Sequence, residues 1–183
     1  MKINMIKPPI VLACVCAVCC GLLALANSIT KDKIEAAENA AVQESLSVLP
    51  NAGSFEEIEE FSVPEMEKVK IDGLYKDEKD QMAVLVTADG YNKGGIQAVI
   101  GIDKNGSITG ISFVSVTETP GLGTKIQSNP ELMADKLTGI SNTDSVDALD
   151  GITGATFSSK GLKNAVKCVL ETFDLNKEAI LNE

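Results

Sequence analysis

The residues best suited to chemistry lie between Asp150 and Lys160, where two glycines and four hydroxyl side chains precede a helical pattern. Gly151 and Gly154 permit a tight turn that a side chain would obstruct. Apolar residues then recur at helical spacing, at Leu162, Ala165, Val166, Val169 and Leu170. Hydroxyls at a helix start cap free N–H groups, and the same groups bind anions such as phosphate. The stretch therefore predicts a helix start that is either capped or holds a phosphate.

A second informative stretch runs from Thr117 to Ile126, with the sequence Thr-Glu-Thr-Pro-Gly-Leu-Gly-Thr-Lys-Ile. Its Pro-Gly pair predicts a turn, and the glycine at position 123 permits a close backbone approach to a neighbour. Lys125 is able to neutralise one negative charge. The residues alone are equally consistent with a plain connection between a strand and a helix.

The first stretch resembles the acceptor motif of bacterial flavin transferases, Asp-x-x-(Ser/Thr)-Gly-Ala-(Ser/Thr), at every defined position. Here the motif is Asp150-Gly-Ile-Thr153-Gly154-Ala155-Thr156. The resemblance implies FMN joined through its phosphate to the Thr156 hydroxyl, which would make the chain a phosphoprotein. Asp150 would serve that modification or cap the turn. The other residues implied near the cofactor are Thr153, Gly154, Ala155, Ser158 and Lys160.

The second stretch resembles a loop of the FMN-binding domain found in the RnfG proteins of the Rnf complex and the NqrC proteins of the sodium-pumping NADH–quinone reductase. In that family the loop lies against the flavin. The matching residues are Glu118, Thr119, Gly121, Leu122, Gly123 and Lys125. One departure is that family members commonly carry a His shortly before this loop, where this chain has Val116 and Thr117. A His is therefore not expected as a proton donor.

Both motifs in order, together with an N-terminal anchor, make the chain resemble the RnfG members of this family most. The resemblance implies a membrane-anchored electron carrier with covalent FMN, inside a ferredoxin–NAD⁺ oxidoreductase that exports Na⁺ or H⁺. It implies no catalysis by this chain alone. The expected partners are the A, B, C, D and E proteins of the Rnf complex and a flavin transferase for maturation. Two alternatives stay open: an NqrC-like or free-standing extracytoplasmic flavoprotein, and a non-redox surface domain with Thr156 unmodified.

The composition narrows the chemistry further. The chain has 183 residues, 16 Lys+Arg against 26 Asp+Glu, a net charge of −10, and no His or Trp. Every basic residue is a lysine, so the bidentate guanidinium that usually binds phosphate is absent. Without His the chain lacks the commonest metal ligand and neutral-pH acid–base group, and no metal is expected. Nucleic acid is not an expected partner, because its binding requires a basic surface.

The N-terminus carries an uncharged apolar run over residues 10–29, long enough to cross a bilayer as a helix. We expect residues 1–9 in the cytoplasm, a transmembrane helix over 10–29, a connecting helix over 30–50 and an extracytoplasmic domain over 51–183. A cleaved signal peptide is the rival interpretation, because Ala24-Leu-Ala26 is an acceptable cleavage site. The four cysteines in the run, at positions 14, 16, 19 and 20, are expected to act as small apolar residues.

The remaining pattern predicts an α+β domain of sheet and helices. Apolar runs predict strands over 68–76 and 81–88, the latter buried on both faces. Asn105-Gly106 between two further runs predicts a hairpin of strands 96–103 and 107–116. Helices are expected over 129–137 and after the acceptor motif. The acidic cluster at 56–60 is expected to be a surface turn or short helix.

Overall fold

The computed structural model describes residues 3–50 and 53–181, which fall into two units divided after Ala41. Helix α1, Ile3–Val48, contains the first unit and its last turns belong to the second. In the described part of the chain α1 is the one helix long and apolar enough to span a membrane, over Pro9–Val48. The helix predicted after the apolar run therefore continues from it without a break.

The second unit is built on a five-stranded sheet with the order β1-β2-β3-β4-β5, in which every neighbouring pair is antiparallel. The strands are β1 Phe55–Ile58, β2 Val69–Asp77, β3 Met82–Ala88, β4 Ile96–Ile102 and β5 Ile108–Val116. The predicted hairpin is confirmed as β4 and β5, and the α+β class is confirmed. Consecutive strands are neighbours throughout, so no connection crosses the sheet.

The acidic cluster was expected as a turn or short helix, and this expectation is wrong at its start. Phe55–Ile58 is an edge strand that pairs with β2, with Phe55 opposite Asp77 and Ile58 opposite Leu74. Phe55 and Ile58 are half-buried while the two glutamates between them are exposed. An edge strand needs only its backbone groups to pair on one side, so charged side chains that face solvent are compatible with it.

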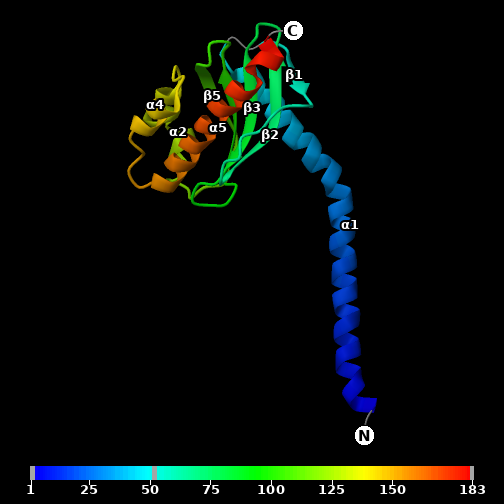
Figure 1. Cartoon of the computed structure of the whole chain (residues 1–183). Coiled ribbons are helices and arrows are strands. Elements are labelled where there is room, and N and C mark those ends of the chain that lie inside the picture. The colour runs from blue at the N-terminus through cyan, green and yellow to red at the C-terminus, as the bar shows by residue number, and fades with distance from the viewer. Residues whose placement is uncertain (1–2, 51–52, 182–183) are drawn as a thin grey trace. The chain divides into compact units, whose positions relative to one another are not determined.

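Both faces of the sheet are covered within the second unit. Helix α5, Thr156–Leu181, crosses one face and contacts β2, β3 and β4 (Figure 1). The end of α1 covers the other face through Val42, Leu46 and Leu49, which pack with Tyr75, Ala83, Leu85 and Val99. Alternate residues of β3 therefore enter two separate apolar clusters, which confirms its predicted burial on both faces.

The segment between β5 and α5 contains only short helical pieces (Figure 1). They are α2 Lys125–Ser128, η1 Pro130–Leu132, α3 Ala134–Leu137 and α4 Thr143–Ala148. The single helix predicted over 129–137 is broken at Met133, whose backbone lies outside the helical region with φ −146° and ψ −57°. The Met133 side chain is buried in the core under α5, so tertiary packing decides the local backbone here.

We expect Leu46→Ala to lower the free energy of unfolding of the second unit by about 2–5 kcal/mol, because it removes a side chain that is only 2% exposed between α1 and the sheet. Val48 on the same helix is 67% exposed, and Val48→Ala is expected to change stability by about 0.5 kcal/mol or less. Denaturant unfolding of the full chain in detergent measures both. Equal effects would contradict the packing of α1 against the sheet.

Cys168 on α5 is buried, and burial, with a smaller contribution from the Glu171 carboxylate, raises the pKa of its thiol from 9.0 to about 11. We expect iodoacetamide to leave the Cys168 peptide unlabelled in the folded chain at pH 9 and to label it in urea, as quantified by peptide mass spectrometry. The unfolded thiol ionises first, so this contribution to stability is full below pH 9 and decreases between about pH 9 and 11. Rapid labelling of folded protein would contradict this.

Candidate functional site

The acceptor motif forms a tight loop that ends at the first residue of α5. Gly154 has φ +81°, a conformation that favours glycine, and the Ala155 N–H donates to the Ile152 carbonyl at 2.9 Å. The buried Ser159 hydroxyl accepts from the Ile152 N–H at 2.9 Å, which fastens the loop to the helix. Thr156 therefore begins the 26-residue helix, as predicted, with an exposed side chain.

The second motif reaches the same helix start through Glu118, which is only 5% exposed. Its Oε1 accepts from the Asn92 N–H at 3.1 Å, and its Oε2 accepts from the Tyr91 N–H at 3.0 Å. The Ser158 hydroxyl also donates to Oε2. One carboxylate thus joins the 89–95 loop, the loop after β5 and the first turn of α5. The predicted phosphate ligand Ser158 has its hydroxyl proton engaged by Glu118.

Three glycines leave the space that the Glu118 side chain occupies. A Cβ on Gly90 would lie 2.6 Å from Glu118 Oε1, and one on Gly95 would lie closer still. A Cβ on Gly123 would lie 2.7 Å from Glu118 Cβ and 2.6 Å from Ser158 Oγ. The glycine of the second motif at position 123 is therefore required for a close approach, as its sequence context predicted.

A pocket of about 380 Å³ lies where the two motifs meet. It is lined by Tyr91, Glu118, Thr119, Leu122, Gly123, Gly154, Ala155, Thr156, Phe157 and Ser158. The Tyr91 and Phe157 rings meet edge to face, with centroids 6.1 Å apart and planes at 70°. Tyr91 is 70% exposed and Phe157 65% exposed, so both rings present apolar surface at the site. The volume falls in the range typical of small-molecule sites.

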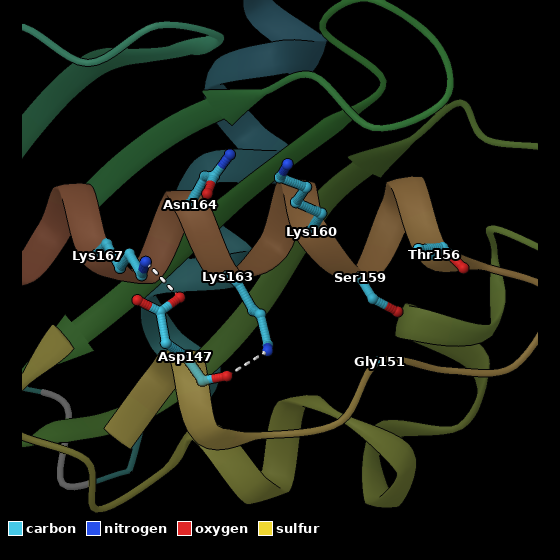
Figure 2. Close-up of a pocket in the computed structure, with 8 residues that line it drawn as sticks. All are labelled: Asp147, Gly151, Thr156, Ser159, Lys160, Lys163, Asn164 and Lys167. Atoms are coloured by element: carbon cyan, nitrogen blue, oxygen red, sulfur yellow. Dashed lines mark hydrogen bonds and ion pairs between the residues drawn. The ribbon is translucent and has the colours of Figure 1, made fainter. Parts of the chain in front are cut away.

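Thr156 also lines a second pocket of about 300 Å³ on the other side of the helix start (Figure 2). Lys163 Nζ donates to the Asp147 and Leu149 carbonyls, and Lys167 forms an ion pair with Asp147 at 2.5 Å. These two lysines hold the end of α4 against α5, beside the start of the acceptor loop. Lys160, one turn after Thr156, is exposed and lines the same pocket.

Three of the predicted site residues lie together in a different place. Asp150, Thr153 and Lys125 line a pocket of about 520 Å³ beside α2 and α3. Gly121 has φ +72° in the turn of the second motif, where its N–H donates to Thr124 Oγ1 at 3.0 Å. The predicted residues therefore converge on the helix start from two sides, and Thr156 itself borders two of the pockets.

Sequence reasoning missed Tyr91 and Phe157 as pocket residues. Tyr91 lies in a loop that the sequence marked only by its glycines, Gly90, Gly94 and Gly95. That density of glycine was the available signal, because Gly90 and Gly95 face the Glu118 carboxylate. Over residues 3–50 and 53–181, no group of three His, Cys, Asp or Glu side chains is arranged to hold a metal ion.

Known proteins share both halves of this arrangement. The family model described as FMN-binding domain matches residues 90–171, which contain the Tyr91 loop and both motifs. The model of the RnfG N-terminal region matches residues 1–49, the segment of α1.

Similar proteins extend over the full chain, and three of them are named as the G subunit of an ion-translocating oxidoreductase complex. The one from Shewanella piezotolerans is 28% identical over 203 residues, covering 100% of this chain and 95% of the relative. The one from Erwinia tasmaniensis is 31% identical over 183 residues, covering 88% and 86%. The one from Vibrio vulnificus is 29% identical, covering 89% and 86%. The chain therefore belongs to the RnfG family, the G subunits of ion-translocating oxidoreductase complexes.

Proposed function

We propose that this chain is an electron-carrying subunit of an ion-translocating oxidoreductase complex, with FMN esterified through its phosphate to Thr156 Oγ1. The observation that carries the proposal is the place of the Thr156 side chain. It is exposed at the border between the pocket lined by Tyr91, Leu122 and Phe157 and the pocket that contains Lys160. An apolar ring system and a phosphate group require surroundings of these two kinds on either side of one hydroxyl.

The residues present fit such a group. Aromatic and aliphatic surfaces of Tyr91, Phe157 and Leu122 suit a flat ring, and the bare backbone of Gly123 and Gly154 leaves room beside it. The N–H groups at the start of a 26-residue helix favour an anion, and Lys160 adds a positive charge one turn later. When bound, FMN supplies the redox chemistry, while the protein binds and orients it.

A covalent link accounts for the absence of an arginine phosphate clamp. Esterification forms one bond between Thr156 Oγ1 and phosphorus, and the net addition is FMN less water. The link prevents loss of the cofactor, so the noncovalent contacts need not hold it alone. We propose that a separate flavin transferase makes the bond and that Asp150, which is exposed in the adjacent pocket, serves that modification.

The names of the relatives support a place in a multi-subunit complex. We propose that the complex is of the Rnf type, with its A, B, C, D and E proteins as partners, and that it couples ferredoxin–NAD⁺ electron transfer to Na⁺ or H⁺ export. Helix α1 would anchor the chain with the sheet domain on the extracytoplasmic side. This chain would relay electrons rather than catalyse a reaction by itself.

We expect Thr156→Ala to abolish covalent flavin while the domain remains folded, because the exposed side chain contributes little to packing. Thr156→Ser keeps the hydroxyl and is expected to keep the flavin. In-gel fluorescence under denaturing conditions and intact mass measure both variants after expression with the transferase. A Thr156→Ala band that still fluoresces would rule out this residue as the acceptor.

We expect the chain purified from its native membrane to retain residues 1–26, because the apolar run continues past the Ala24-Leu-Ala26 site and α1 is unbroken to Val48. Intact mass spectrometry distinguishes the two forms directly. A mature chain that begins at Asn27 would replace the membrane anchor with a cleaved signal peptide.

A further inference from the structure

We propose that Glu118 is a positioning residue of the flavin pocket whose negative charge also makes the bound flavin harder to reduce. The proposal rests on the proposed function and concerns the same pocket. It assigns to one carboxylate two effects, assembly of the pocket wall and control of the reduction potential. Each effect has its own measurement.

The positioning effect follows from where the hydrogen bonds lead. Oε2 receives the Tyr91 N–H and the Ser158 hydroxyl, so both residues are held by the same oxygen. Ser158 directly follows Phe157, whose ring meets the Tyr91 ring. Glu118 therefore fixes the backbone beside both members of the aromatic pair, although these members are 66 residues apart in the chain (157 − 91).

The charge effect follows from the nature of these partners. All three are neutral donors, two backbone N–H groups and one hydroxyl, and they satisfy a carboxylate without neutralising it. Among the described residues that line this pocket, Glu118 alone carries a charge. A negative charge beside a partly enclosed cavity opposes the addition of an electron there. Glu118 therefore lowers the potential of a flavin in the pocket.

A second buried carboxylate supplies a matched control. Asp77 accepts three backbone N–H groups, from Gly53 at 3.2 Å and from Lys79 and Gln81 at 2.8 Å each. It is 3% exposed and ends β2. The strand register places it at the opposite end of the sheet from the Glu118 loop, because β2 begins beside Ala88 and the start of β4. Asp77→Asn removes a comparable buried charge away from the pocket.

The first experiment measures assembly without flavin, by amide hydrogen exchange of the full chain in detergent in a Thr156→Ala background. Glu118→Gln keeps one acceptor oxygen, but its NH₂ cannot accept from Tyr91 N–H. We expect faster exchange in the peptide that covers residues 89–95, and no change there in Asp77→Asn. Unchanged exchange in Glu118→Gln would overturn the positioning role, whether or not the native chain carries flavin.

The second experiment is a mediated redox titration of the flavin-loaded full chain. We expect Glu118→Gln to shift the midpoint potential to a more positive value, and Asp77→Asn to leave it unchanged. Ser158→Ala keeps the charge but removes one stabilising donor, so we expect a shift in the opposite, negative direction. A loosened pocket alone would move both variants the same way. If Glu118→Gln does not fold, Ser158→Ala decides: a negative shift supports the charge effect, and any other result overturns it.

The two proposals fail in distinguishable ways. A wild-type chain without flavin, purified from cells that contain the transferase, would refute the proposed function, and the exchange measurement would still decide the positioning role. A wild-type chain with flavin whose potential is the same in Glu118→Gln would leave the proposed function intact. That result would overturn the charge effect of Glu118.

Discussion

The hydrogen bond from the Ser158 hydroxyl to the Glu118 carboxylate joins two segments that lie 40 residues apart in sequence. Around it the chain leaves space rather than filling it, with glycines at positions 90, 95 and 123. A buried carboxylate is stable only when its oxygens are hydrogen-bonded, so the surrounding loops must stay where their donors reach it. The exposed threonine at the start of α5 takes its surroundings from this requirement.

The sheet provides the rigid base for these loops. The loop after β5 and the 89–95 loop leave the sheet at the same end, because Val116 is opposite Ile96 and Ile96 is opposite Ala88. Helix α5 begins beside both loops and then crosses the sheet face (Figure 1). Antiparallel pairing thus brings a loop of residues 89–95, a loop of residues 117–124 and a helix start at residue 156 to one place.

Strong local patterns predicted most of the fold. The β4–β5 hairpin followed from Asn105-Gly106 between apolar runs, and the start of α5 followed from Gly154 and the hydroxyls before an amphipathic pattern. Strand β1 was missed because an exposed edge strand pairs through its backbone and leaves little apolar pattern. The break at Met133 and the contribution of Tyr91 depend on contacts between distant segments, which residue spacing does not encode. The motif residues were found by resemblance, whereas their division among three pockets required coordinates.

The end of α1 makes the anchor helix part of the folded domain. Val42, Leu46 and Leu49 fill an apolar cluster with Ala83 and Leu85 on the sheet. A fragment cut at Pro50, the obvious junction in the sequence, would leave that sheet face bare to water and prone to self-association. A water-soluble version of the domain must therefore begin no later than Ala41, carrying the last two turns of the helix with it. The boundary that matters for handling this protein lies inside a helix rather than at its end.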